Sequence, residues 1–494
     1  MASGVTYLDY QSTTPCDPAV VEAMAPWWSD TFANPASRLH RPGLTAAAVV
    51  QQSRTAIATA LGLTAEELIF CSGASEANNL AIKGVAEAEL RRGGTRRRLI
   101  CLATEHRAVL DPMRYLAGHG FELVCLAPQP NGLIDLQQLE AALSPETLLV
   151  SVMAANNEIG VLQPLEVIGQ LCHQQQVLFH CDGAQAVGHL PLQPLSLGID
   201  LLSFSGHKLY GPKGIGALAI APGVDLAPQQ HGGSQERGLR AGTLPVPLIV
   251  GLAKALELAE ADREARGQRL AVLRNALWQR CQALGGIQRN GAETPCLPHN
   301  LNISIKGVEG TALHQALRRS LAVSSGSACA AGEPSHVLQA LGRSRLEAAA
   351  SARPLMPRLQ GVLEGWRLLH PDLTLSASLT LEDGAALLDP AFEDTVTTLL
   401  NNAAEANLQA DAHTLHLEAE TAGGWLRLSV EDEGGTPVMA LPPGPVSSKK
   451  PYGAGAGLVL AQANLERLGG QLTITEGRAG WRATLTLPLV PAHG

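Results

Sequence analysis

Residues 201–208, Leu-Leu-Ser-Phe-Ser-Gly-His-Lys, form a short apolar run that ends in a glycine and two basic side chains. Stretches with helical spacing, such as 75–90 and 165–174, separate this run from others like it. The other strand-like runs are 67–71, 98–102, 122–126, 148–153 and 177–181. This alternation predicts an α/β domain with a largely parallel sheet, whose ligands bind where the strands end.

The remainder of the chain indicates further domains, since 494 residues are too many for one. A long helical stretch, 248–284, leads to a second α/β unit with a strand at 300–305. An alanine-rich segment, 346–352, is followed by Pro354 and Pro357, which would interrupt a helix. We expect a large domain at 1–250, a small domain at 251–353 and another domain at 354–494.

Composition excludes several classes of protein. Residues 354–494 carry 16 acidic and 8 basic side chains, a net charge of −8 out of −9 for the whole chain, so nucleic-acid binding is not expected. No apolar run approaches a membrane span and no signal peptide is apparent, which predicts a cytoplasmic protein. The nine cysteines are scattered without a CxxC pair, as is typical of a reducing compartment.

Lys208 and Asp182 are the first candidate site residues, because each follows a predicted strand. A lysine there could form a Schiff base with an aldehyde cofactor, and a carboxylate could hold the proton on a pyridine nitrogen. The alternatives are a surface lysine and a turn or cap aspartate.

Two further strand ends carry polar residues. Residues 71–79, Cys-Ser-Gly-Ala-Ser-Glu-Ala-Asn-Asn, open a helix whose N-terminus favours a phosphate, and Ser75 could add a hydroxyl. A helix cap without a ligand is the alternative. His106 ends the segment Thr-Glu-His, where its ring could lie over a cofactor or be structural.

These segments belong to an ordered series that resembles the cysteine desulfurases, which are pyridoxal-phosphate enzymes of fold type I in the class V aminotransferase group. The resemblance runs from Tyr7 to Gly342. Its motifs are Tyr-Leu-Asp-Tyr-Gln-Ser-Thr-Thr-Pro (7–15), Asn-Pro-Ala-Ser (34–37), Ala-Asn-Asn-Glu-Ile-Gly-Val (155–161), His-Cys-Asp-Gly-Ala-Gln (180–185), Ser-Gly-His-Lys (205–208), Arg-Ala-Gly-Thr-Leu-Pro (240–245) and Ser-Ser-Gly-Ser-Ala-Cys (324–329).

The resemblance implies a role for each matching residue. Lys208 would hold pyridoxal phosphate, Asp182 and Gln185 would bond its ring nitrogen and ring oxygen, and His106 would stack on the ring as an acid or base. Asn157 would contact cofactor and substrate. The phosphate would be bound by Ser75, Ser205 and His207, and by Thr243 across a homodimer interface.

Cys329 would be the nucleophile that takes sulfur from L-cysteine as a persulfide and passes it to an acceptor such as an iron–sulfur scaffold protein. Its flanks, 323–334, are almost all Ser, Ala and Gly, which is typical of a mobile loop. By contrast, Cys71, Cys101, Cys125, Cys172 and Cys181 lie in or beside strand and helix patterns, and we expect them to be buried.

The pattern changes after Gly342. Arg353 has the spacing of the family's substrate-carboxylate arginine, but a proline-bounded turn, Pro-Leu-Met-Pro (354–357), replaces the usual Phe-Ser-Leu-Gly. The family's closing segment is missing, so the small domain is truncated. This places the carboxylate site, the stability of the small domain and scaffold docking in doubt.

Residues 355–487 resemble the α/β-sandwich ATP-binding domain of sensor histidine kinases. Thr-Leu-Leu-Asn-Asn-Ala (398–403) places Asn402 at the magnesium position, and Asp432 and Gly434 match the adenine-contacting box. A glycine-rich lid includes Gly453, Gly455 and Gly457. Thr398 and Thr436 depart from the pattern, and no phosphoacceptor-histidine motif is present. His370 precedes Pro-Asp and is expected in a turn. An inert remnant that folds without binding ATP remains an alternative to an ATP/Mg site.

The sequence thus predicts a homodimeric L-cysteine desulfurase fused to a kinase-type ATP-binding domain. Two alternatives stay open. One is a selenocysteine lyase, and the other is an impaired desulfurase that serves as an ATP-binding regulatory protein.

Overall fold

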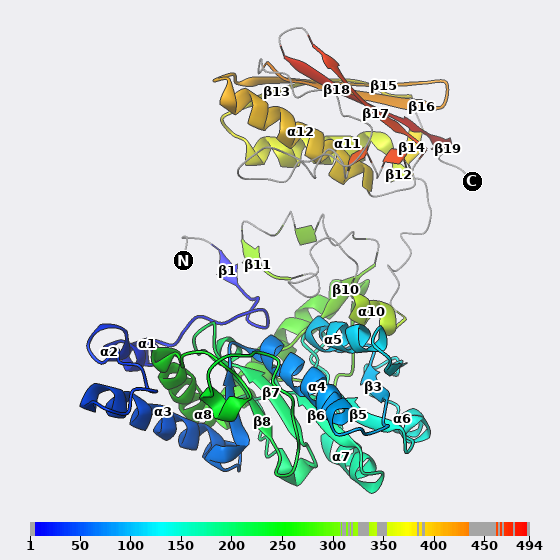
Figure 1. The fold of residues 1–494 in the computed structure, drawn as a ribbon. Coiled ribbons are helices and arrows are strands. Elements are labelled where there is room, and N and C mark those ends of the chain that lie inside the picture. The colour runs from blue at the N-terminus through cyan, green and yellow to red at the C-terminus, as the bar shows by residue number, and fades with distance from the viewer. Residues whose placement is uncertain are drawn as a thin grey trace. The chain divides into compact units, whose positions relative to one another are not determined.

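The computed structural model divides the chain into two compact units, Met1–Leu346 and Glu347–Gly494 (Figure 1). None of the helices in the described part of the chain is long and apolar enough to cross a membrane. The residues that the structure describes are 5–306, 308, 313–314, 317, 320–324, 335–342, 353–382, 385–387, 391–433, 461–462, 465–466, 469–477 and 480–491.

A seven-stranded sheet forms the centre of the first unit, with strand order β2-β8-β7-β6-β5-β3-β4. All neighbours are parallel except β8, which is antiparallel to both β2 and β7. The largely parallel α/β sheet expected from the alternating runs is therefore present, with β8 as its antiparallel member. The strands are β2 (Leu68–Cys71), β3 (Arg98–Leu102), β4 (Glu122–Leu126), β5 (Thr147–Ser151), β6 (Leu178–Asp182), β7 (Leu201–Ser205) and β8 (Gly216–Ile220).

Helices cover both faces of this sheet, because alternate strand residues point to opposite sides. Leu68 and Phe70 pack into one apolar core, and Ile69 and Cys71 pack into the other. The first core is covered by α1 (Pro18–Met24), α3 (Arg41–Ala60), α6 (Leu136–Ala142), α7 (Leu165–Gln174) and α8 (Val246–Gln282), and the second by α4 (Ala74–Arg91) and α5 (Arg107–Ala117). The sheet is thus buried on both faces, as is usual for parallel strands.

Smaller elements complete the first unit. β1 (Thr6–Tyr7) pairs in parallel with β11 (Leu321–Ala322), and β9 (Ile287–Arg289) pairs antiparallel with β10 (Ile303–Ile305). The predicted strand at 300–305 is therefore shorter than expected. Two short helices, α2 (Pro26–Ser29) and α10 (His336–Ala340), also belong to the described part of this unit.

The second unit is a two-layer α/β sandwich. Its five-stranded sheet has the order β13-β15-β16-β18-β17, with only β13 and β15 parallel. Helices α11 (Leu355–Leu369) and α12 (Ala391–Gln409) lie on one face of it (Figure 1), around a core that includes Trp366 and Phe392. The strands are β13 (Thr374–Thr380), β15 (Thr414–Ala422), β16 (Trp425–Glu431), β17 (Gln471–Glu476) and β18 (Trp481–Pro488), and a second sheet joins β12 (Arg353–Pro354), β14 (Ala385–Leu387) and β19 (Val490–Pro491).

The junction differs from expectation. The Pro-Leu-Met-Pro segment is not a turn, because β12 ends at Pro354 and α11 begins at Leu355. Pro357 lies in the first turn of α11, where its missing N–H would have had no helical partner. His370 follows α11 and stacks on Trp366 with ring centroids 4.4 Å apart, beside the expected turn.

Candidate functional site

Asp182 and Lys208 lie at the same edge of the seven-stranded sheet. Asp182 is the last residue of β6, and Lys208 ends a single 3-10 turn that directly follows β7. These two strands are parallel neighbours with Asp182 opposite Ser203. Their carboxyl ends therefore bring a carboxylate and an amine to one edge, where ligands of α/β sheets bind.

The Asp182 carboxylate is buried and held from two sides. Asn78 Nδ2 on α4 donates to Asp182 Oδ2 at 2.8 Å, and the backbone N–H of Ala184 donates to Oδ1 at 2.9 Å. Asn78 is itself fully buried. The two donors fix the orientation of the carboxylate, and a cationic ring nitrogen would supply its natural counter-charge.

The N-terminal segment approaches Lys208. Lys208 Nζ donates to the backbone oxygens of Gln11 and Ser12, at 2.9 Å for the latter. Gln185 Nε2 donates to the same Gln11 oxygen at 3.0 Å. Two of the side chains that the resemblance assigns to the cofactor, Lys208 and Gln185, thus converge on Gln11.

His106 is the N-cap of α5, directly beyond β3. The Ala108 N–H donates to His106 Nδ1 at 3.0 Å, so a neutral ring would carry its proton on Nε2. Burial lowers the pKa of His106, against the opposing influence of Asp182. The ring is therefore predominantly neutral near pH 7 and offers its Nε2–H as a donor, while Nδ1 can take a proton only after it releases the Ala108 N–H.

The preceding Glu105 is fully buried. One of its oxygens, Oε1, accepts the Met153 N–H at 2.9 Å, and burial raises the pKa of this carboxyl well above its ordinary value. Glu105 thus joins the end of β3 to the segment after β5.

The N-terminus of α4 and the end of β7 form a cradle for an anion. Gly73 has φ +157°, and a Cβ on Gly216 would lie 2.7 Å from Gly73 Cα, so glycine is needed where β8 passes this turn. Ser75 is exposed in the first turn of α4, and Ser205 is buried beside Gly73. Backbone N–H groups at such a helix start favour a phosphate.

His207 also lies at this edge. Thr13 Oγ1 is 3.1 Å from His207 Nδ1, and burial together with Lys208 and Lys213 lowers the pKa of His207 to about 4. A neutral His207 would donate to a phosphate through its ring N–H.

Two unpaired polar atoms support the fit of a cofactor. Asn157 Oδ1 and Gln11 Nε2 are buried with no hydrogen-bond partner among the described protein atoms. Such atoms call for a ligand or water. Together with the lysine, the oriented carboxylate and the glycine-lined helix start, they fit pyridoxal phosphate, with Lys208 and Asp182 at its ring and Ser75, Ser205 and His207 at its phosphate.

The other predicted residues are spread more widely. Thr243 is exposed, in a loop tied to α4 by the ion pair of Arg240 with Glu76 at 2.8 Å. Arg353 lies in β12, and only its backbone is described. Cys329, Gly434, Gly453, Gly455 and Gly457 fall outside the described residues.

In the second unit, Asn402 lies on α12 and Asp432 directly follows β16. Asn402 Nδ2 is buried with no partner among the described atoms, and Asp432 Oδ1 accepts the Trp481 N–H at 3.1 Å. Buried Asn407 accepts the Glu433 N–H at 2.7 Å and donates to the Thr414 oxygen at 2.6 Å. Asn407 therefore fixes the segment after β16 against α12.

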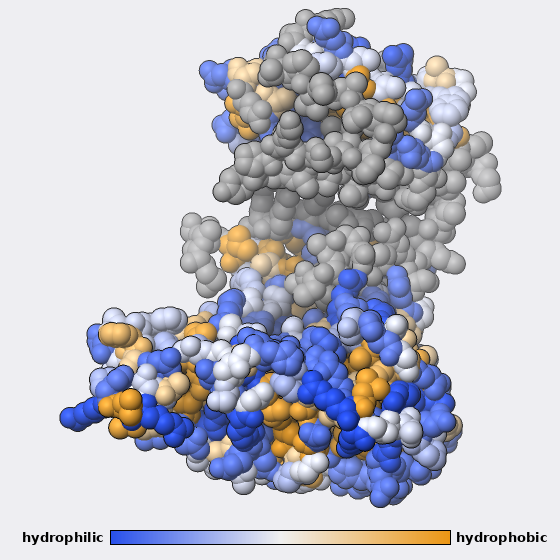
Figure 2. Space-filling view, in the orientation of Figure 1, coloured by the Kyte–Doolittle hydropathy of each residue, from blue (hydrophilic) through white to orange (hydrophobic). Residues whose placement is uncertain are grey.

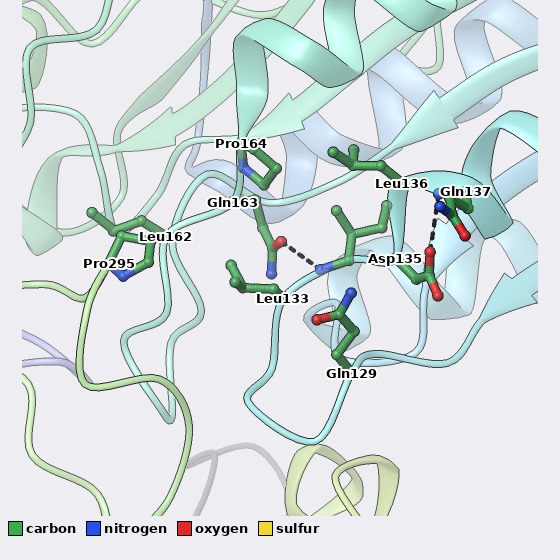
Figure 3. A pocket seen from close by; sticks show the side chains of 10 residues that line it. Gln129, Leu133, Asp135, Leu136, Gln137, Leu162, Gln163, Pro164 and Pro295 are labelled. Atoms are coloured by element: carbon green, nitrogen blue, oxygen red, sulfur yellow. Dashed lines mark hydrogen bonds between the residues drawn. The ribbon is translucent and has the colours of Figure 1, made fainter.

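A pocket of about 720 Å³ lies elsewhere in the first unit (Figure 3). Gln163 and Ile134 both line this pocket, and Gln163 Oε1 accepts the Ile134 N–H at 2.9 Å. None of its lining residues belongs to the predicted cofactor site. They are Gln129, Leu133, Ile134, Asp135, Leu136, Gln137, Leu162, Gln163, Pro164 and Pro295.

Four residues that contact predicted site residues or their neighbours were not predicted from the sequence, namely Gln11, Thr13, Asn78 and Asn407. Gln11 and Thr13 lie in the quoted motif 7–15, and Asn78 lies in 71–79. The sequence feature that could have indicated them is a polar side chain beside a glycine-rich segment or a strand end.

Comparison with known proteins supports the same class of enzyme. Residues 6–351 match the aminotransferase class-V family, and residues 389–491 match the family of histidine kinase-, DNA gyrase B- and HSP90-like ATPases. Cysteine desulfurase IscS of Edwardsiella ictaluri is 48% identical over 342 residues, covering 68% of this chain and 84% of that protein. IscS of Pectobacterium carotovorum subsp. carotovorum is 48% identical over 353 residues, covering 70% and 86%.

Solved structures agree. A NifS-like protein superposes with a TM-score of 0.65 at 35% identity, covering 70% of this chain and 91% of that one. The structure titled "SspA in complex with cysteine" gives a TM-score of 0.62 at 39% identity, covering 70% and 96%. The chain belongs to the aminotransferase class-V family. Its first unit is a pyridoxal-phosphate-dependent cysteine desulfurase, and a histidine kinase-like ATPase domain follows it.

Proposed function

We propose that the first unit converts L-cysteine to alanine and leaves the sulfur as a persulfide on Cys329. The observation that carries this proposal is the convergence of Lys208 and oriented Asp182 on one sheet edge. The names of the curated relatives support the substrate.

Asp182, Gln185 and His106 would each have a separate role around the cofactor. When bound, pyridoxal phosphate supplies an electron-withdrawing ring that weakens bonds at the substrate α-carbon. Asp182 holds a proton at the ring nitrogen, and Gln185 contacts the ring oxygen. His106, neutral with Nδ1 accepting the Ala108 N–H, donates a hydrogen bond from Nε2; release of that N–H lets Nδ1 accept a proton, and the charged ring then returns a proton from Nε2.

The sulfur step involves Cys329. Its thiolate attacks the sulfur of the bound substrate, so the carbon–sulfur bond breaks as a sulfur–sulfur bond forms. The carbon gains a proton and leaves as alanine. Cys329 then carries a persulfide, which a thiol of an acceptor protein removes in the cytoplasm. An iron–sulfur scaffold is the acceptor class that we propose.

A homodimer completes the site in this proposal. Thr243 is exposed on its own chain, so it is available to a phosphate bound by a second copy. Large apolar side chains are also exposed near the N-terminus, and Figure 2 shows apolar surface in the region that Figure 1 labels α1 to α3. Trp28, Phe32 and Leu39 are among them, with 60%, 76% and 100% of their surface exposed. Burying these side chains would favour association.

We further propose that the second unit binds ATP with magnesium. Asn402 Nδ2 lacks a described partner, and Asp432 is buried and oriented by the Trp481 N–H. The match to the ATPase family supports this assignment.

The desulfurase proposal is tested with two variants. Purified protein with pyridoxal phosphate should absorb visible light. Lys208→Ala should lose this band and all sulfide production, whereas exposed Lys213→Ala should keep both. Cys329→Ser should keep the band but form no persulfide. A persulfide found by mass spectrometry on a different cysteine of the wild type would refute the Cys329 assignment.

A further inference from the structure

Cys101 and Cys125 face one another across two neighbouring strands. Cys101 on β3 is the register partner of Cys125 on β4, and their Sγ atoms are 4.0 Å apart. We propose that this pair is a redox-active dithiol that reacts with the sulfur–sulfur bond of a small disulfide or polysulfide and closes to a cross-strand disulfide. This site is separate from the persulfide cysteine of the proposed function.

The two thiols differ in access. β4 is an edge strand of the sheet, and Cys125 is exposed there, which corrects the expectation that it would be buried. Cys101 lies one strand further in and has no exposed surface. An incoming reagent can therefore reach Cys125 first, and Cys101 only through it.

The hydrogen bond between them favours a thiolate on the exposed partner. Cys101 donates to Cys125, and this bond, with a further contribution from Arg114, lowers the pKa of Cys125 to about 7 against the effect of burial. The same bond, with burial, raises the pKa of Cys101. Cys125 is thus suited to attack, because the thiolate is the reactive species.

The backbone allows the pair to close. Neighbouring strands lie about 4.8 Å apart, within the roughly 4.4–6.8 Å over which a disulfide joins two Cα atoms. Both side chains point to the face covered by α4 and α5, since Cys101 packs there and parallel register partners share a face. Rotation of the two side chains should bring the sulfurs together without moving the strands.

The reaction balances in two exchange steps. Cys125 thiolate attacks one sulfur of a disulfide R–S–S–R, forms a mixed disulfide and releases one thiolate R–S⁻. Cys101, giving up its proton, attacks Cys125 Sγ and releases the second R–S⁻. The protein dithiol is oxidised by two electrons and the reagent is reduced. With a polysulfide attacked at its terminal sulfur, the shortened polysulfide leaves and Cys125 carries a persulfide; Cys101 then attacks Cys125 Sγ and releases hydrosulfide.

The other cysteines of the first unit show why this pair stands out. Cys71, Cys172 and Cys181 are buried, and burial raises the pKa of each thiol, for Cys172 to about 12. Cys281, near the end of α8, is partly exposed. It provides a natural comparison for a thiol outside the pair.

The test uses reduced full-length protein without cysteine, treated separately with oxidised glutathione and with sodium tetrasulfide. Peptide mass spectrometry should find a Cys101–Cys125 disulfide. Formation with both reagents, or with only one, supports the site and identifies which source of the sulfur–sulfur bond it accepts. Cys101→Ser should instead trap glutathione, or extra sulfur, on Cys125, and wild-type Cys281, which lies outside the pair, should react in the same way.

Alkylation gives a second measurement that does not depend on disulfide closure. The rate at which iodoacetamide modifies Cys125 should rise with a midpoint near pH 7 in the wild type, as the lowered pKa requires. Cys101→Ala, which removes the donor, should shift the midpoint upward, and Cys101→Ser should restore it. The proposal is overturned if neither reagent links the pair, or if wild-type Cys125 ends as a stable mixed disulfide.

Discussion

Asn78 Nδ2 lies 2.8 Å from Asp182 Oδ2, and this contact joins the helix at the proposed phosphate cradle to the carboxylate at the proposed ring nitrogen. Asn78 is on the second turn of α4, which begins at Ala74, and both side chains are buried. One amide therefore couples the two ends of the cofactor site.

Replacing Asn78 with alanine should weaken binding of pyridoxal phosphate. Losing a hydrogen bond to a buried charged group costs roughly 1–3 kcal/mol, or about five-fold to 150-fold in affinity. Titration of the cofactor-free protein, followed by visible absorbance, measures this change. Asn79→Ala is the matched control, because the partner of Asn79 Nδ2 among the described residues is the Ser75 oxygen on the helix surface. Equal affinities for the two variants would show that Asn78 does not support the site.

Arg353 should be a poor carboxylate clamp. An arginine fork binds a carboxylate well only when the guanidinium is held in place. Here Arg353 belongs to β12, which pairs with β14 of the second unit, and α11 begins two residues later. We expect a high Michaelis constant for cysteine in the wild type, with cofactor binding unaffected.

Arg353→Ala should then change the kinetics of cysteine turnover little. A poorly held arginine binds the ground state and the transition state equally weakly, so its removal has a small effect on either. Steady-state rates over a range of cysteine concentrations measure this. The opposite outcome is a low Michaelis constant for the wild type and a loss of more than about ten-fold in kcat/KM for the variant. Arg353 would then be a working clamp, supported by the segment that follows it in this chain.

ATP with magnesium should raise the melting temperature of the second unit. A ligand that binds only the folded state stabilises it by about 2.7 kcal/mol at one hundred times its dissociation constant. Asn402→Ala and Asp432→Ala should abolish the shift. Asp372→Ala, an exposed acid after α11, should retain it. The inert-remnant interpretation predicts no shift in any of the four proteins at millimolar ATP.

Acid should destabilise the first unit through buried His180. Its ring lies between Ser151, 2.7 Å from Nδ1, and Ser203, 3.0 Å from Nε2, and burial lowers its pKa to about 4 from 6.5. Because the unfolded chain binds the proton more tightly, this stability is complete above pH 6.5 and is lost as pH falls toward 4, by up to roughly 1.4 kcal/mol per pH unit.

Urea unfolding between pH 7.5 and 5 tests this dependence. His180→Gln should unfold more easily at pH 7.5 and should lose less stability on acidification than the wild type. His119→Gln replaces an exposed histidine and should keep the wild-type slope. A His180→Gln slope equal to that of the wild type would assign the acid sensitivity to other groups.

The sequence predicts much of the sheet and less of its details. The limits of β3, β4 and α7 agree with the runs 98–102, 122–126 and 165–174, because buried apolar stretches bounded by polar turns are local signals. The strand β8 was not identified, and its antiparallel direction depends on packing between β2 and β7. Pro357 was misinterpreted because proline also suits the first turn of a helix.

The candidate site, like the sheet, could be predicted only in part from the sequence. Asp182 and Lys208 could be placed at strand ends from apolar runs alone. Gln11 and Asn78 could not be assigned roles, because their contacts join segments separated by 174 and 104 residues in sequence. The exposure of Cys125 likewise depends on the position of β4 at the edge of the sheet, which its own sequence does not encode.

The backbone of Gln11 and Ser12 accepts from Lys208, and β1 just before it pairs with β11. During synthesis residues 6–12 must therefore wait for residues some three hundred positions later before they can dock. Closing so long a loop is slow relative to local contacts. The lysine amine should accordingly stay accessible in a nascent or partly folded chain, so the cofactor can enter before the N-terminal segment settles beside it.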